Sequence, residues 1–203
     1  MISDEVIEDS VIVTEEEKKI IKEIIYEIPF YFRPSSTSPK FPYFGHRLSA
    51  RPFDENDFNH LSKIDIESNY FNFFYNLVYR FCRKHNIEYK NVIRSFINST
   101  FYVDGYKHTD PHVDSCVNHI VILIYLNEIS TSSKTIVYEK IKNPDETECL
   151  VDVDSLECKN LKIKKEISPD FCKIVAFDGK YFHSNKIPLP GENRVVCVFN
   201  LLT

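Results

Sequence analysis

Apolar residues near the start of the chain recur with the spacing of a helix. One apolar face carries Ile20, Ile21, Ile24, Ile25 and Ile28. Positions three and four residues apart lie on the same side of a helix, so this face predicts an amphipathic helix. Thr14 and Glu17 precede it at the spacing of a capping box, in which each side chain accepts a hydrogen bond from the other residue's backbone amide. We therefore predict that the helix begins directly after Thr14.

Two further helices are predicted before residue 90. A strong apolar face runs from Tyr70 to His85, and a weaker one covers residues 54–64. The stretch between the first helix and these two, residues 33–53, contains Pro34, Pro39, Pro42 and Pro52. Proline has no backbone donor and cannot continue a helix, so we predict a long connection across this stretch.

After residue 90 the pattern changes to alternating or continuous apolar runs separated by turn residues, which is typical of antiparallel strands. The predicted strands cover residues 91–103, 109–114, 117–126, 134–140, 148–153, 160–167, 172–177, 181–185 and 194–201. The predicted fold class is mainly β: a double-stranded β-helix (jelly roll, cupin-like) formed by residues 91–203. Residues 1–90 are predicted to be an N-terminal helical support layer of the same domain, packed on one sheet.

Composition narrows the function classes. The chain of 203 residues suits one domain, and its net charge is −5 with Lys and Arg scattered. The composition therefore does not indicate a concentrated basic surface that would bind nucleic acid, although it does not exclude a local basic groove. The six cysteines form no C-x-x-C pair and are interpreted as free thiols. The first nine residues lack a signal-peptide pattern and no apolar run reaches membrane-spanning length, which predicts a cytoplasmic protein.

Candidate chemistry lies in two distant segments. His112 and Asp114 are two residues apart, so a strand would present both to one face, and His183 follows much later. Two imidazoles and one carboxylate on one face of an iron leave three coordination positions open, as non-haem oxygenases require. A second His-x-Asp pair, His108 and Asp110, is an alternative. We favour His112 and Asp114 because they lie nearer the apolar run at residues 117–126.

Arg194 opens the last apolar strand. A guanidinium at the start of a buried strand carries a desolvation cost that calls for an anionic partner. A ligand carboxylate is one such partner. Together with the two histidines and the aspartate, Arg194 defines a candidate site for an iron and an anionic co-substrate.

The ordered set His112-x-Asp114, His183 and Arg194 resembles the 2-oxoglutarate- and Fe(II)-dependent dioxygenases, above all their prolyl-4-hydroxylase-like branch with its viral and phage members. Tyr102, ten residues before His112, and the run Tyr125-Leu126-Asn127 resemble further elements of that branch. A departure is the segment Ser132-Ser133-Lys134-Thr135, which stands where the branch often has Gly-Gly-x-Thr.

The resemblance implies roles for these residues. His112, Asp114 and His183 would be the catalytic iron ligands, and Arg194, Tyr125 and Tyr102 the residues that bind the co-substrate. The implied cofactors are Fe(II), 2-oxoglutarate and O₂, with ascorbate as a further candidate. The implied reaction is hydroxylation of a C–H bond, most readily in a protein or peptide side chain, with decarboxylation of 2-oxoglutarate to succinate and CO₂. A viral or phage protein would act in a host cytoplasm.

Two other functions stay open. One is oxidative demethylation or hydroxylation of a nucleobase, which the acidic balance disfavours. The other is a non-catalytic metal-binding β-barrel module, which would produce no succinate. Substrate contacts are predicted at the rim of the site, from Tyr106, His108, Asp110 and the loop from Arg47 to Arg51.

Overall fold

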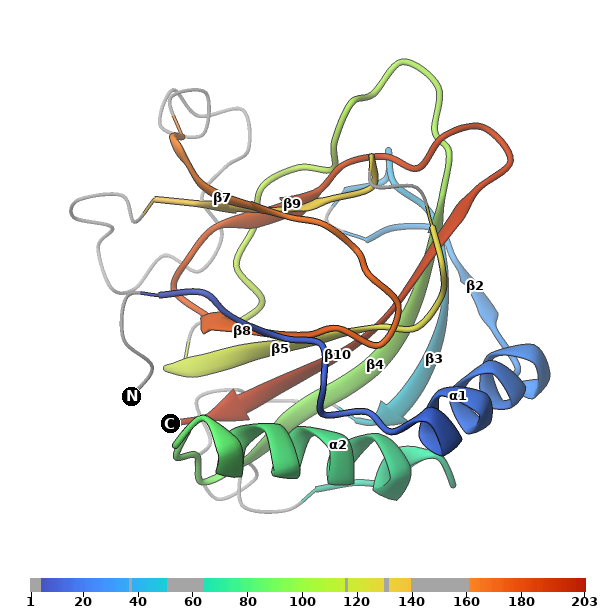
Figure 1. The fold of residues 1–203 in the computed structure, drawn as a ribbon. Helices are drawn as coiled ribbons and strands as arrows, with labels where there is room; N and C mark the ends of the chain where they lie inside the picture. Colours follow the sequence, from blue (N-terminus) through green and yellow to red (C-terminus); the bar gives the residue numbers. More distant parts are fainter. Residues whose placement is uncertain (1–4, 37, 51–63, 116, 130–131, 140–160) are drawn as a thin grey trace.

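The computed structural model describes residues 5–36, 38–50, 64–115, 117–129, 132–139 and 161–203. This part of the chain forms two facing antiparallel sheets, with two helices below the larger sheet (Figure 1). The predicted mainly β, jelly-roll architecture is confirmed.

The larger sheet has seven strands in the order β1-β8-β5-β10-β4-β3-β2. The long strand β10 lies between β5 and β4 and pairs with both along most of its length. The strands are β1 (Ile7–Asp9), β2 (Tyr31–Arg33), β3 (Tyr43–Ser49), β4 (Asn91–Phe101), β5 (His119–Tyr125), β8 (Ile174–Asp178) and β10 (Asn193–Leu202).

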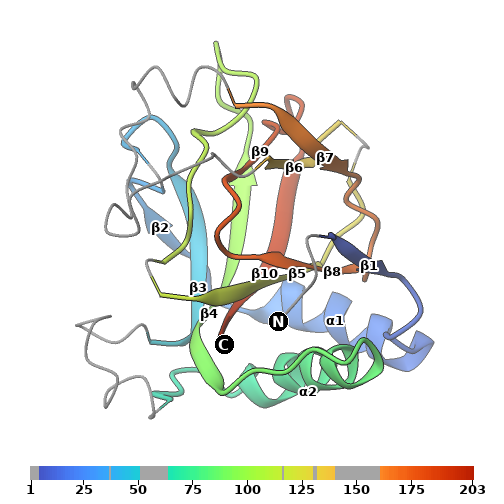
Figure 2. The same cartoon turned by 90° about the vertical axis from the view of Figure 1, so that its left-hand side faces the viewer.

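The smaller sheet has three strands in the order β7-β6-β9 and faces the larger one (Figure 2). Its strands are β6 (Thr135–Tyr138), β7 (Ile163–Ile167) and β9 (His183–Asn185). Isolated bridges pair His108 with Lys186 and His112 with His183. The chain before β5 therefore runs beside β9 without forming a continuous strand.

Helices α1 (Glu15–Glu27) and α2 (Phe71–Lys84) pack below the larger sheet, on the side away from the smaller one (Figures 1 and 2). The capping box is present: the Thr14 hydroxyl accepts from the Glu17 amide, and the Glu17 carboxylate accepts from the Thr14 amide. Neither of the helices seen in the described ranges has the length and apolar content to cross a membrane.

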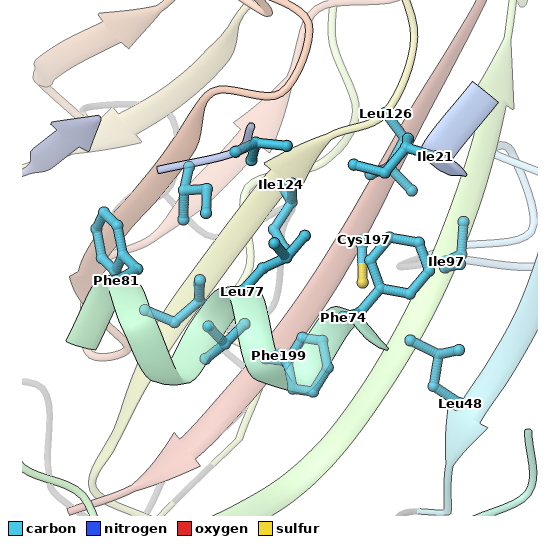
Figure 3. Packing of buried hydrophobic residues seen from close by; sticks show 14 of the residues in the cluster. Ile21, Leu48, Phe74, Leu77, Phe81, Ile97, Ile124, Leu126, Cys197 and Phe199 are labelled. Carbon is cyan, nitrogen blue, oxygen red and sulfur yellow. The ribbon is translucent and has the colours of Figure 1, made fainter. Parts of the chain in front are cut away.

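The main core fills the space between α2 and the larger sheet. Figure 3 shows Phe74, Leu77 and Phe81 of α2 directed at the sheet, where they meet Ile124 of β5 and Phe199 of β10. A second apolar cluster lies on the opposite face of the sheet, formed by residues such as Val121, Leu123, Phe177 and Val198. Strands β5, β8 and β10 are thus apolar on both faces, which explains their continuous apolar runs.

Several sequence predictions are corrected by the structure. The stretch 33–53 is not only a connection, because β3 lies within it and β2 ends at its start. With β1, the first ninety residues supply three strands of the larger sheet as well as the helices. The predicted strand at 109–114 is replaced by the bridges beside β9. The predicted elements at 54–63 and 148–153 lie outside the described residues.

Candidate functional site

Two histidines far apart in the sequence lie side by side on the smaller sheet. The His112 amide donates to the His183 carbonyl at 3.0 Å, and the His183 amide donates to the His112 carbonyl at 2.9 Å. This reciprocal pairing directs both side chains to the same face, and the two ring centroids are 4.5 Å apart. The bridge between them is therefore what brings the two imidazoles together.

Asp114 completes a cluster with these two rings. Its Oδ1 atom is 3.8 Å from Nε2 of His112, and its Oδ2 atom is 3.8 Å from Nε2 of His183. All candidate ligand atoms of the three residues lie within 4.8 Å of one another. Metal bonds to imidazole nitrogen and carboxylate oxygen are about 2.0–2.2 Å long, so these separations suit ligands of one ion.

The other ring nitrogens fix the tautomers of both histidines. Nδ1 of His112 donates to the Asp110 carbonyl at 3.1 Å, and Nδ1 of His183 donates to the Tyr181 carbonyl at 3.3 Å. Each Nε2 atom then carries the lone pair that binds a metal. Burial, followed by the nearby His112, lowers the pKa of His183 to about 3, and burial also lowers the pKa of His112. Both rings are therefore neutral at neutral pH.

Arg94, on β4, holds Asp114 in its anionic form. Its Nη2 atom donates to Oδ1 of Asp114 at 2.5 Å, and the carboxylate side chain is 6% exposed. Burial alone would raise the pKa of Asp114, but Arg94 and the neighbouring histidines outweigh it and hold that pKa well below its usual range. Arg94 was not among the site residues predicted from the sequence. The available signal was a charged residue on the same strand face as Phe96 and Asn98.

A second polar cluster surrounds Arg194. The residue is 6% exposed, and no carboxylate of the described segments lies within ion-pair distance of its guanidinium. Its Nη2 atom donates to Oγ1 of Thr135 at 2.7 Å, and the Tyr125 hydroxyl lies 2.7 Å from the same oxygen. The guanidinium carbon is 5.4 Å from the centre of the Tyr125 ring. The predicted pair of Arg194 and Tyr125 thus meets, with Thr135 as an additional member.

Both clusters open into one cavity of about 490 Å³ between the sheets. Its lining includes Arg94, Arg194 and Thr135. It also includes His112, Asp114 and His183, the candidate metal-ligand cluster. Strands β4 and β10 form the floor of the cavity. In their register, Arg94 of β4 lies opposite Asn200 of β10, and Arg194 of β10 lies opposite Thr100 of β4. The two arginines therefore stand toward opposite ends of the same two strands, with the cavity between them.

Comparison with known proteins gives matches at the level of structure. No protein-family model matches the sequence, and no curated protein matches it. A 2OG-Fe(II) oxygenase family oxidoreductase from Burkholderia pseudomallei has a TM-score of 0.67 at 11% identity, covering 97% of this chain and 84% of that one. A prolyl hydroxylase from Trichoplax adhaerens, solved with a peptide fragment of hypoxia inducible factor, has a TM-score of 0.58 at 13% identity, covering 98% and 84%.

The chain has the fold of the 2OG-Fe(II) oxygenases. A third structure of this kind is the alpha ketoglutarate dependent epimerase SnoN from nogalamycin biosynthesis, with a TM-score of 0.60 at 10% identity, covering 98% of this chain and 78% of that one. Within this fold, His112, Asp114, His183 and Arg194 all line one cavity.

Within this oxygenase fold, Asn127 fixes the backbone on both sides of Arg194. Its side-chain Nδ2 donates to the Asn193 carbonyl at 2.8 Å, and its Oδ1 accepts from the Val195 amide at 2.8 Å. Asn127, which follows Tyr125-Leu126, therefore holds the backbone at the start of β10, from which the Arg194 side chain reaches the cavity.

Some predicted residues do not reach the site of the oxygenase fold. Tyr102 is 40% exposed, its hydroxyl donates to Asp104, and it does not line the cavity formed by the described residues. His108 is exposed and lies outside the metal-ligand cluster, whereas Asp110 lines the cavity without joining that cluster. Of the two His-x-Asp pairs, the structure brings His112 and Asp114 to His183.

The other predicted rim residues have local partners. Tyr106 packs edge to face on Phe41, with ring centroids 5.1 Å apart. Arg47 pairs with Glu67 at 3.1 Å, and both side chains are exposed. Of the rest of the predicted rim loop, Leu48 and Ser49 are buried residues of β3, and Arg51 lies outside the described residues.

Proposed function

We propose that this protein is a 2-oxoglutarate- and Fe(II)-dependent dioxygenase that hydroxylates a C–H bond. One observation carries the proposal: a two-histidine, one-carboxylate cluster and a buried guanidinium without a carboxylate partner among the described residues open into a single cavity. A metal-binding module needs only the cluster. The separate anion site indicates a dicarboxylic co-substrate held beside the metal.

The residues fit both groups. His112 and His183 present Nε2 lone pairs, and Asp114 presents an anionic carboxylate, which is the facial set that suits Fe(II). At the other end, the Nε atom of Arg194 is buried and has no hydrogen-bond partner among the residues that the structure describes. A buried donor without a partner destabilises the folded protein unless a ligand accepts its hydrogen bond. The distal carboxylate of 2-oxoglutarate would bind there bidentately.

Bound iron, 2-oxoglutarate and O₂ would supply the oxidation, in which one oxygen atom enters the substrate C–H bond, the other enters succinate, and CO₂ leaves. The chain's own residues bind and orient. The Thr135 hydroxyl accepts a hydrogen bond from Arg194 and shares one with the Tyr125 hydroxyl, which holds both residues in place. Leu123, Val196 and Val198 keep part of the cavity floor apolar. An apolar floor excludes water and so strengthens the ion pair to Arg194.

For the substrate we propose a protein or peptide side chain. The resemblance to the prolyl-4-hydroxylase-like branch supports it, as does the structural neighbour solved with a peptide fragment. A prolyl peptide is the substrate that this resemblance suggests. SnoN, which has the same fold, is an epimerase from nogalamycin biosynthesis, so the substrate screen should include small molecules as well as peptides.

The test is anaerobic addition of Fe(II) and then 2-oxoglutarate. A chelated keto acid on ferrous iron gives a weak visible charge-transfer band, and we expect this band in the wild type. Asp114→Ala and His183→Ala should lose it, whereas His108→Ala, at the exposed alternative pair, should keep it. Succinate formation under air then separates an enzyme from a non-catalytic module. A band that survives Asp114→Ala would contradict the proposed iron site.

A further inference from the structure

The cavity holds polar atoms that the binding of iron and 2-oxoglutarate does not use. Oδ2 of Asp110 and Oδ1 of Asn98 are both buried, and neither has a hydrogen-bond partner in the described part of the chain. Both residues line the cavity. Two unsatisfied acceptors in one cavity call for a ligand with hydrogen-bond donors, because an acceptor left unpaired away from water is destabilising.

Asp110 contributes a negative charge as well as an acceptor. No lysine, arginine or histidine nitrogen of the described segments lies within ion-pair distance of it, and Arg94 is paired with Asp114 instead. A carboxylate at the wall of a cavity is stabilised by a cation. The overall charge of −5 also attracts cationic substrates and disfavours phosphates.

Aromatic rings line the cavity as well. Tyr43 and Phe96 pack edge to face with centroids 6.1 Å apart, and both line the cavity together with Phe182. Aromatic faces attract ammonium and guanidinium groups. Gly45 makes this arrangement possible, because a Cβ atom there would lie 2.3 Å from the Phe96 ring. Asn185 also lines the cavity, and its buried Nδ2 atom has no hydrogen-bond partner within the described ranges, so it offers a donor to a carbonyl oxygen of the substrate.

We infer that the substrate group admitted to this cavity carries a cationic nitrogen, which Asp110 binds, so that Asp110 is a specificity-determining residue. The chemistry is that of a lysine or arginine side chain, in a peptide or as a free amine. The inference rests on the proposed oxygenase function and makes it narrower. A prolyl side chain offers neither a donor nor a charge to Asp110.

The carboxylate of Asp110 can be changed without removing the hydrogen bond that its backbone makes with His112. Its carbonyl oxygen, not its carboxylate, accepts the hydrogen bond from Nδ1 of His112. Asp110→Asn keeps the size of the side chain and the carbonyl while removing the charge. Glu128→Gln is the matched control, because it removes one negative charge from an exposed residue that pairs with Lys22.

The experiment measures succinate formation with a panel of peptides that share one frame and differ at a central lysine, arginine, norleucine or proline. Free lysine, free arginine and a single-stranded oligonucleotide complete the panel. We expect a lysine or arginine member to stimulate turnover over norleucine at least tenfold in kcat/KM. In Asp110→Asn the KM for that member should rise at least tenfold, while Glu128→Gln behaves as wild type.

Three results would overturn the inference: norleucine or proline matching the cationic members, the oligonucleotide as the sole stimulant, or an unchanged KM in Asp110→Asn. The charge-transfer band distinguishes failure of the inference about Asp110 from failure of the proposed oxygenase function. If wild type shows the band but no cationic preference, only the inference about Asp110 fails. If wild type shows no band, the proposed oxygenase function fails and the inference fails with it.

Discussion

Arg94 donates a hydrogen bond from its Nη2 atom to Oδ1 of Asp114, so that a cation from the larger sheet is paired with a candidate metal ligand. The pair joins β4 to the segment that runs beside β9, at the metal end of the cavity. In the absence of metal, Arg94 is the cation that compensates the buried carboxylate. A bound divalent ion would share that task.

Arg94→Gln should therefore destabilise the metal-free protein and increase its response to metal. Removing one partner of a fully buried ion pair costs about 3–5 kcal/mol. The Arg94 side chain is 29% exposed, so solvent screening reduces the expected loss to about 1–3 kcal/mol. Mn(II) should raise the melting temperature of Arg94→Gln more than that of the wild type, because the ion replaces the missing charge.

Thermal unfolding with and without Mn(II) checks this prediction. Arg47→Gln is the control, since it removes an arginine from an exposed pair with Glu67 and should cost less than about 1 kcal/mol. Equal Mn(II) shifts in Arg94→Gln and wild type would show that Arg94 supports the fold without compensating Asp114.

Thr135 connects the two residues predicted to bind the co-substrate. Thr135→Val keeps the shape but removes the oxygen that meets both the Arg194 guanidinium and the Tyr125 hydroxyl at 2.7 Å. Two buried polar groups then lose a partner, and we expect the Kd for 2-oxoglutarate to rise about tenfold, equivalent to about 1.4 kcal/mol. Titration of the charge-transfer band measures this. Thr135→Ser retains the hydroxyl and should bind normally; weakening of Fe(II) binding itself would argue against the assignment.

Local sequence rules predicted the parts of the site that local geometry controls. His112 and Asp114 are two residues apart, and Arg194 precedes an apolar run, so each could be recognised without knowledge of the fold. Arg94 could not be assigned in this way. Whether Arg94 meets Asp114 depends on how the two sheets face one another, which no short stretch of sequence specifies.

The missed strands β2 and β3 have a comparable explanation. Pro34 directly follows β2 and Pro42 directly precedes β3, so the prolines stand at strand ends, where a missing backbone donor is tolerated. Read locally, the same prolines indicate a loop. The pairing of β3 with β4, a strand about fifty residues later in the chain, decides the outcome.

Asn127 should act as a positioning residue for Arg194. Asn127→Ala removes the two hydrogen bonds that hold the Asn193 carbonyl and the Val195 amide, and it leaves every charged group in place. We expect the KM for 2-oxoglutarate to rise about tenfold while kcat at saturation falls less than twofold, because the guanidinium is misplaced but still present. A melting temperature that falls while this KM stays unchanged would assign Asn127 a purely structural role.

The low pKa of His183 predicts how stability depends on pH in the metal-free protein. The folded state holds this imidazole neutral down to a pKa of about 3, whereas an unfolded histidine titrates near 6.5. Between those values the unfolded state binds the additional proton, so stability is fully present above about pH 6.5 and is lost as pH falls toward 3. From pH 7 to pH 5 the expected loss from this residue is about 2 kcal/mol.

Urea unfolding of the chelator-treated protein at pH 7 and pH 5 measures this loss. His183→Gln removes the titrating group, so its stability should fall by about 2 kcal/mol less than that of the wild type over the same interval. His108→Gln is the control, because it removes an exposed histidine that lies outside the metal-ligand cluster. If His183→Gln and wild type lose the same stability between pH 7 and pH 5, then the buried, neutral imidazole that the metal cluster requires is not present in the folded protein.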